Sequence, residues 1–363
     1  MIELLSGITP ITDLNDAWAH KAHGSQARAL RVAAERLHER AQSGPRVVSV
    51  RTFSLGTLPY PTKYAFQGVV RTLSPFVLLT HRAVLVQFLQ QGELKHLLFN
   101  PSDIEAARQT PYFMRLAATL PSAIEHVTAK RYESLETQMA RVGIANADID
   151  YVAFDHFHTQ DVRPLLGTID GRWKARFPKS VLLAPQCEWD DWDNLHPWQA
   201  AWFIADGKRD VSTARVAFTS GDLQLGDGVM LLRTPGHTSG NQTLFLNTES
   251  GIWGISENGT SADNWSPLES RLPGMREMCR RQDLDLIINS NTPEFGATQY
   301  NSMILERTLV DRVRANPRFV QMFPSSEFTA HFVAPRLRPT WSHGAIESGV
   351  VVRPTSQAAT AAE

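Results

Sequence analysis

Two histidines, at positions 156 and 158, are the first residues in this chain whose type and spacing suggest chemistry. His156 and His158 follow the apolar segment 151–154, and Asp161 comes three residues after the pair. In an extended segment, side chains two residues apart lie on the same side, so both imidazoles can reach one ion. Asp155 precedes the pair and is expected to point to the opposite side, where its carboxylate can hold an imidazole N–H. The segment therefore predicts part of a metal site.

A third histidine follows a second apolar segment. Residues 229–233 run into a Pro-Gly turn, and His237 comes next, within Thr-Pro-Gly-His-Thr at 234–238. The turn directs the imidazole off the sheet edge, and the small residues beyond it leave space for an ion or a ligand. The alternative is a turn histidine that hydrogen-bonds only to backbone.

Two further apolar segments also end in polar side chains. Glu257 follows residues 251–256, and Asn289 and Asn291 follow residues 284–288. A single Glu at such a place is otherwise solvated or caps a helix. Together, the four segments predict polar side chains delivered at strand ends.

The elements that must position these residues alternate between strands and helices. Helical spacing of apolar residues predicts an amphipathic helix over 25–42. Short β-branched and apolar runs predict an early, mostly antiparallel sheet at 46–55, 68–79, 82–89 and 94–99, with a turn-rich loop at 56–61. Helices are expected at 105–118 and 131–143, and later strands at 149–154, 180–183, 229–233, 242–246, 251–256 and 284–289. This alternation is typical of a layered α/β protein.

Length and composition exclude several classes of protein. The 363 residues are enough for a large core, and 36 basic side chains nearly balance 37 acidic ones, which argues against nucleic-acid and membrane partners. Two cysteines exclude a disulfide framework and a four-thiolate zinc site. The N-terminus lacks the pattern of a secretion signal, and no apolar run approaches the roughly 18 residues of a spanning helix, so a cytoplasmic protein is expected.

In this order, the segments resemble those of the metallo-β-lactamase-fold hydrolases. That family has a His-x-His-x-Asp-His loop after a strand, a Thr-Pro-Gly-His-Thr turn, a strand that ends in a bridging Asp and a last strand that ends in His. The turn at 234–238 matches residue for residue, and the resemblance covers roughly residues 46–300. It implies an α/β fold, an αββα sandwich over 45–300. An N-terminal helical extension (1–44), a C-terminal extension packed on the domain (301–353) and a disordered tail (354–363) are expected around it.

The chain departs from the family pattern at the second metal position. Gln160 stands where the family has Asp, Asp161 where it has His, and Glu257 where it has the bridging Asp. An asparagine occupies the place of the last histidine. The resemblance thus implies one intact three-histidine site and a second site without most of its ligands.

A metal-dependent hydrolase follows from the resemblance, acting on a small-molecule ester, lactone, thioester or amide through a metal-bound hydroxide. His156, His158 and His237 are expected to hold one zinc ion, with iron or manganese as alternatives. Glu257 is expected to join them as a ligand. Asp161 is expected to orient or deprotonate the water, or to bind an ion itself.

The remaining polar residues of the loop are expected to support the ligands rather than bind the ion. Gln160 is neutral and a weaker ligand than a carboxylate, and Asp155 is expected behind an imidazole. Two other functions remain open. The chain can be a catalytically weak or inactive ligand-binding member of this fold, or an iron-dependent redox enzyme.

Four of the nine tryptophans lie between residues 189 and 202. In the family, this region lies between the first two metal motifs, so Trp189, Trp192 and the nearby His196 are expected to line the site of a small-molecule substrate. Core packing and a homodimer contact are the alternatives. No stripe of Lys or Arg accompanies the rings, which argues against a nucleic-acid platform.

Overall fold

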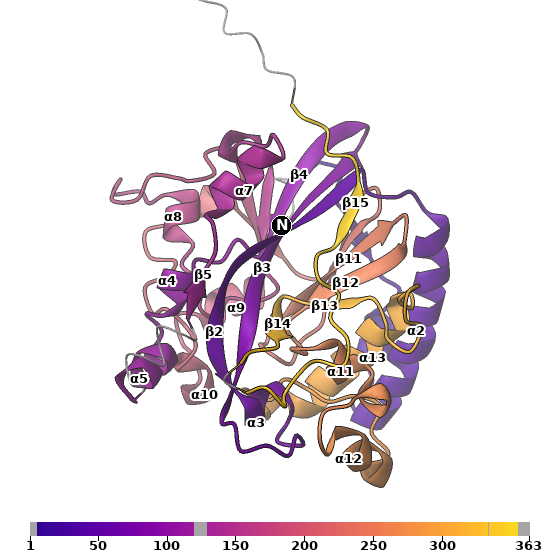
Figure 1. The fold of residues 1–363 in the computed structure, drawn as a ribbon. Coiled ribbons are helices and arrows are strands. Elements are labelled where there is room, and N and C mark those ends of the chain that lie inside the picture. Colours follow the sequence, from indigo (N-terminus) through magenta and orange to yellow (C-terminus); the bar gives the residue numbers. More distant parts are fainter. Residues whose placement is uncertain (1–5, 120–128, 333, 355–363) are drawn as a thin grey trace, which may run out of the picture.

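Two β-sheets lie face to face, with helices on their outer sides (Figure 1). The computed structural model describes residues 6–119, 129–332 and 334–354. Within these residues, the first sheet has six strands in the order β1-β9-β10-β11-β12-β13. Its strands are β1 (Thr9–Ile11), β9 (Asp222–Gly226), β10 (Val229–Arg233), β11 (Gln242–Thr248), β12 (Gly251–Ser256) and β13 (Met322–Pro324). All neighbours are antiparallel except β12 and β13.

The second sheet follows the order β15-β2-β3-β4-β6-β7-β8, with β14 also paired to β3 and β5 to β2. Its strands are β2 (Ser49–Pro61), β3 (Phe76–Gln90), β4 (Glu93–Phe99), β5 (Lys130–Arg131), β6 (Tyr151–Ala153), β7 (Val181–Pro185), β8 (Val216–Thr219), β14 (Ser326–Thr329) and β15 (Glu347–Gly349). The strands β2, β3 and β4 are antiparallel, whereas β4, β6, β7 and β8 run parallel. The parallel half delivers chain segments to one edge of the sheet.

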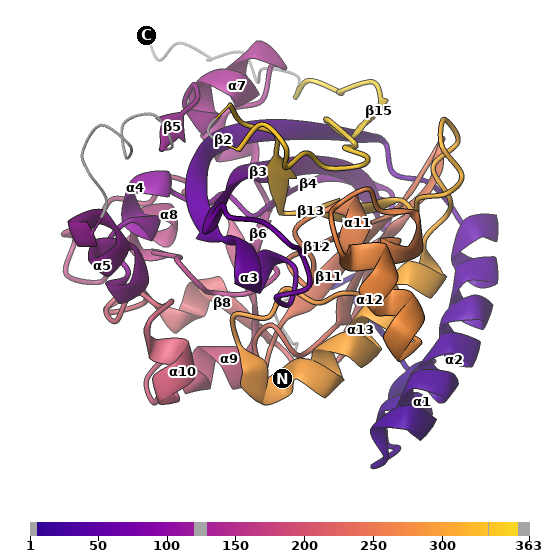
Figure 2. The ribbon, with the colours of Figure 1, turned by 60° about the horizontal axis from the view of Figure 1, so that its bottom comes forward.

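Apolar side chains from both sheets meet between them, among them Val86, Phe99, Leu231 and Leu246. The outer face of the first sheet is covered by α2 (His23–Ser43) and α13 (Gly296–Leu309), which pack against each other (Figure 2). The outer face of the second sheet is covered by α4 (Ile104–Ala107), α7 (Leu135–Arg141) and α9 (Gln186–Asp191). The remaining helices are α1 (Asn15–Trp18), α3 (Thr62–Ala65), α5 (Pro111–Thr119), α8 (Arg163–Leu166), α10 (Pro197–Ala200), α11 (Ala262–Trp265) and α12 (Met275–Gln282).

This arrangement is the αββα sandwich that the resemblance implies, so the predicted fold is confirmed. The outer segments are more closely integrated than predicted. Helix α13 runs across the expected boundary between residues 300 and 301, and β13, β14 and β15 pair within the two sheets. Residues 301–353 therefore complete the sandwich instead of extending it. Of the predicted tail, residues 355–363 lie outside the described part of the chain.

Three local predictions were wrong. The turn-rich stretch 56–61 belongs to β2, because β3 pairs with it across a bulge between Ser54 and Gly56. The separate strands predicted at 68–79 and 82–89 are replaced by one strand, β3, that starts at Phe76. Residues 284–289 form no strand in the described structure. No helix among the described residues has the length and hydrophobicity to cross a membrane.

Candidate metal centre

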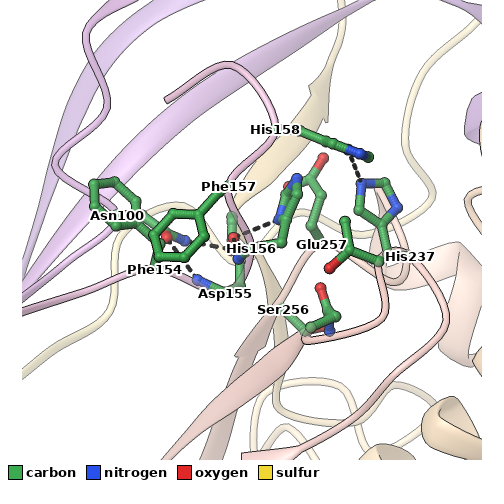
Figure 3. Close-up of polar contacts among 12 residues, drawn as sticks. Asn100, Phe154, Asp155, His156, Phe157, His158, His237, Ser256 and Glu257 are labelled. Atoms are coloured by element: carbon green, nitrogen blue, oxygen red, sulfur yellow. Dashed lines mark hydrogen bonds and ion pairs between the residues drawn. The ribbon is translucent and has the colours of Figure 1, made fainter. Parts of the chain in front are cut away.

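The three predicted histidines lie together at one end of the sandwich (Figure 3). His156 and His158 follow β6, and His237 follows β10 across the interface between the sheets. Their nearest ring nitrogens all lie within 4.8 Å of one another, and each residue is at most 8% exposed. Among the described residues, they form the one cluster of His, Cys, Asp or Glu side chains that meets this distance.

The turn that carries His237 depends on a glycine. Gly236 has a φ of +139°, and a Cβ there would lie only 2.3 Å from the Cα of Gln299 in α13. Any other residue would collide with backbone, so the helix and the turn can approach only at glycine. The short distance explains how His237 reaches the loop of the other sheet.

Hydrogen bonds select which nitrogen of two of the rings faces the cluster. His156 donates its Nδ1 proton to Asp155 Oδ1 at 2.7 Å, so Nε2 is the nitrogen that faces the cluster. His158 donates its Nε2 proton to Gln199 Oε1 at 2.5 Å, which leaves Nδ1 unprotonated. Because carboxylate and amide oxygens only accept, both tautomers are fixed. The contact expected between Asp155 and an imidazole is therefore present in the structure.

The site keeps two of its imidazoles neutral. Burial, followed by repulsion from His156, lowers the pKa of His158 well below its usual value, and burial and the other two rings do the same for His237. Neutral imidazoles present lone pairs to a metal ion, whereas protonated ones cannot bind it. The surroundings thus hold two ligands in the binding form.

The distance between two of the nitrogens fits a metal ion. His158 Nδ1 lies 3.2 Å from His237 Nε2. Two nitrogens bound to a tetrahedral zinc ion at about 2.05 Å are about 3.3 Å apart. The residues present therefore suit a small divalent ion at the level of chemistry and spacing.

Asp161 does not join this cluster, so its predicted role as base or metal ligand is corrected. Its carboxylate binds Arg163 through two side-chain contacts, at 2.7 and 2.8 Å, and accepts from the Arg163 backbone N–H. Thr159, with a φ of +63°, reverses the chain after His158. This turn directs Asp161 toward the start of α8, away from the imidazoles.

Gln160 and Glu257 both line the cavity that the three histidines face, which has a volume of about 60 Å³. Gln160 donates to Ser102 Oγ at 2.9 Å. Glu257 is 6% exposed and its Oε2 has no hydrogen-bond partner among the described residues. Burial, together with the charge of Asp155, raises its pKa well above the usual range. It lies outside the group of nitrogens within 4.8 Å, so its role as a ligand stays a prediction.

Two asparagines stand near the expected place of the family's last histidine, and they differ in their contacts. Asn291 lines the cavity, and its Oδ1 has no hydrogen-bond partner among the described residues. Asn289 accepts a hydrogen bond from the Tyr60 hydroxyl at 2.7 Å and donates to the carbonyl of Glu257. Its side chain is 1% exposed, so this pair fills the space with neutral groups. The arrangement supports the prediction that a second ion is poorly held.

Two of the predicted substrate-lining residues belong to the core instead. Trp189 and Trp192 are 7% and 3% exposed and pack against Phe157, which places them behind the metal loop. They do not line the cavity of the histidines, and His196 lines a separate pocket beside Phe295. The core-packing alternative therefore describes the two tryptophans.

The aromatic wall of the cavity includes one of the four tryptophans at 189–202, together with residues that the sequence patterns did not single out. Trp202 lines the cavity, stacks on Tyr112 with ring centroids 4.2 Å apart and lies 6.1 Å from Tyr60. Its backbone carbonyl accepts from Thr159 N, which fixes the wall to the metal loop. Leu58 and Phe113 continue this apolar side.

The polar side of the cavity also contains residues that the sequence analysis missed. Asn100 and Ser325 both donate to Asp155 Oδ2 and line the cavity. Asn100 directly follows β4 and Ser325 follows β13, so each repeats the signal of a polar side chain at a strand end. The predicted strand at 94–99 carries that signal for Asn100, whereas no strand is predicted before Ser325.

No family model matches the sequence, and no curated protein matches it. Among solved structures, a probable metal-dependent hydrolase from Staphylococcus aureus is similar with a TM-score of 0.45 and 14% identity over 62% of this chain and 78% of that chain. A quorum-quenching N-acyl homoserine lactone lactonase is similar with a TM-score of 0.43 and 18% identity, over 66% of this chain and 88% of that chain. A dizinc quorum-quenching lactonase, in complex with a product, is similar with a TM-score of 0.39 and 14% identity, over 59% of this chain and 74% of that chain.

Proposed function

We propose that this chain is a metal-dependent hydrolase of the metallo-β-lactamase type, acting on an ester, lactone, thioester or amide of a small molecule. The observation that carries the proposal is the set of three buried imidazoles with ring nitrogens within 4.8 Å of one another. A divalent ion held there supplies Lewis acidity and lowers the pKa of water. We expect one zinc ion.

The protein's own residues have separable roles in this proposal. His156, His158 and His237 would hold the ion, and Asp155 and Gln199 keep the protons on the nitrogens of His156 and His158 that face away from it. Supporting partners of this kind commonly change metal affinity by about 10–100-fold. We assign Glu257 as an additional ligand, because its buried Oε2 lacks a partner and an ion would compensate its charge.

The cavity favours a neutral substrate with an apolar portion. Its lining includes the apolar and aromatic side chains of Trp202, Tyr60 and Leu58 as well as the neutral polar ones of Asn100 and Ser325. A volume of about 60 Å³ holds only about four to six water-sized spheres. The space therefore suits the group that is cleaved, and we propose that the apolar remainder of the substrate lies against the aromatic side.

The test combines metal analysis with a hydrolysis screen. Wild-type protein and His237→Ala would be assayed against p-nitrophenyl esters, γ-lactones, thioesters and amides after loading with zinc. We expect hydrolysis of at least one class by the wild type and loss of both the ion and the activity in the variant. An ion in the wild type without any hydrolysis would support a ligand-binding protein, and bound iron with a visible absorption band would support redox chemistry.

A further inference from the structure

A buried carboxylate joins the two loops that carry the histidines. Glu188 lies in α9, directly after β7, and is 1% exposed. Its Oε1 accepts from the backbone N–H of Phe157 at 2.6 Å, and its Oε2 accepts from Thr238 Oγ1 at 2.8 Å. Each oxygen of this one side chain thus contacts a different loop.

The two contacted residues are direct neighbours of the predicted ligands. Phe157 lies between His156 and His158, and Thr238 follows His237 (Figure 3). A change in the distance between Phe157 N and Thr238 Oγ1 would therefore change the distance between the imidazoles of the two loops. The loops belong to different sheets, and besides Glu188 they are joined by Gln242, whose backbone N–H donates to Asp155 O and whose side chain donates to Phe154 O, both at 2.8 Å. These bonds lie at the base of the loops, next to the strands, whereas Glu188 contacts the residues beside the histidines themselves.

The packing around Glu188 leaves little freedom for its side chain. A Cβ on Gly240 would lie 2.6 Å from Glu188 Cβ and 2.9 Å from Oε2, so only glycine leaves room for the carboxylate. Trp189, beside it in the sequence, packs on Phe157. The carboxylate is held in place by the same groups that it bridges.

We propose that Glu188 is a positioning residue that sets the separation of the two histidine loops and thereby the metal affinity and coordination geometry of the site. The inference rests on the proposed metal site, but not on the identity of any substrate. It assigns to Glu188 no contact with the ion. Glu188 acts only on the separation of the two loops, because both of its carboxylate oxygens already accept hydrogen bonds from protein donors.

Two substitutions of Glu188 separate the effect of the bridge from the effect of the charge. Glu188→Ala removes both bridging contacts and leaves the Phe157 N–H buried without an acceptor. Glu188→Gln can keep both, since its amide oxygen accepts from Phe157 N and its amide nitrogen donates to Thr238 Oγ1. Recovery by glutamine would show that the bridge matters and that the negative charge does not.

The experiment measures Co²⁺ affinity by competition with a chelator, together with the visible absorption spectrum of the Co²⁺ form, at a temperature below all melting transitions. We expect Glu188→Ala to bind Co²⁺ about 10–100-fold more weakly, with an altered spectrum. Glu188→Gln should stay within about threefold of the wild type, with its spectrum. The matched control is Leu37→Ala, a buried position in α2 that lowers stability far from the site and should leave both readouts unchanged.

Two results would overturn the proposal. One is wild-type affinity and spectrum in Glu188→Ala; the other is a glutamine variant that behaves like the alanine variant. If Glu188→Ala does not fold, Thr238→Val removes one arm of the bridge alone and should weaken Co²⁺ binding by a smaller factor, and unchanged binding there would count against the bridge. Absence of Co²⁺ and Zn²⁺ binding in the wild type would instead contradict the proposed function itself.

Discussion

Asp155→Asn probes how the protein holds its first ligand. The carboxylate accepts four hydrogen bonds, two at Oδ1 from the His156 backbone and Nδ1, and two at Oδ2 from Asn100 Nδ2 and Ser325 Oγ. These bonds and the nearby His156 outweigh the effect of burial, so the pKa of Asp155 is lowered and the group is ionised. Asparagine keeps one acceptor oxygen and turns the other position into a donor.

The magnitude follows from the partners. The Ser325 hydroxyl can rotate and accept a hydrogen bond from the new amide. The side-chain amide of Asn100 cannot flip in the same way, because Asn100 Oδ1 already accepts from the backbone N–H of residue 155. The NH2 group of the new asparagine then faces the NH2 group of Asn100, and these unpaired buried donors lower the unfolding free energy by about 1–3 kcal/mol. His156 also loses its ionised partner, and metal affinity should fall by about 10–100-fold.

The assay pairs chelator competition for Zn²⁺ with denaturant unfolding of the metal-free protein. The matched control is Asp161→Asn, the same substitution six residues further along the chain, where the carboxylate binds only Arg163 among the contacts described above. It should lower stability by about 1–3 kcal/mol while metal affinity stays within a few-fold. Weaker metal binding in Asp161→Asn than in Asp155→Asn would refute this account of the loop.

Three further outcomes follow from the structure. Trp202→Ala and Trp189→Ala should each cost about 3–5 kcal/mol of unfolding free energy in a denaturant titration, because both rings are buried. Only Trp202→Ala should also raise KM for an apolar substrate, because Trp202 lines the cavity and Trp189 does not; a raised KM in Trp189→Ala alone would favour the sequence-based assignment. Gln199→Ala should weaken Zn²⁺ binding by about 10–100-fold in the chelator assay, because its imidazole partner loses a fixed tautomer, and unchanged affinity would contradict that role. A thiol reagent at pH 8 should modify the exposed Cys187 and spare Cys279, because burial raises the pKa of Cys279 to about 11. Mass spectrometry of the native protein should find one modification, and a second one would contradict this.

Local patterns predicted a layered α/β protein and the three histidines, and the resemblance to a known family then implied the sandwich. Alternating strand and helix signals indicate the layers, and His156, His158 and His237 lie three, five and four residues after the end of a strand. The chain needs no long-range information to place such residues at a sheet edge. The match of the turn at 234–238 added the order of the motifs.

The direction of a side chain after a turn was not predictable in the same way. Asp161 lies close to the histidines in sequence, yet the left-handed conformation of Thr159 turns it to Arg163. A non-glycine residue with positive φ is uncommon, and nothing in the local sequence marks it. Nearness in sequence was therefore a poor guide to nearness in space.

The supporting residues were missed because they come from distant segments. Glu188 contacts a residue 31 positions away, Gln199 one that is 41 positions away, and Asn100 one that is 55 positions away. Such pairs depend on how β4, β6 and β7 lie in parallel next to one another. A single sequence shows the strands but not which polar side chains they bring together.

The metal content of the dialysed wild-type protein tests the central claim most directly. Elemental analysis after exhaustive dialysis, with His156→Ala as reference, should find about one equivalent of zinc in the wild type and well below one in the variant, because three imidazoles face one point and the second site has Asn289 paired with Tyr60. No metal in the wild type after loading with zinc, or full occupancy in the variant, would contradict the three-histidine site. Two equivalents that survive dialysis would contradict the single-ion account.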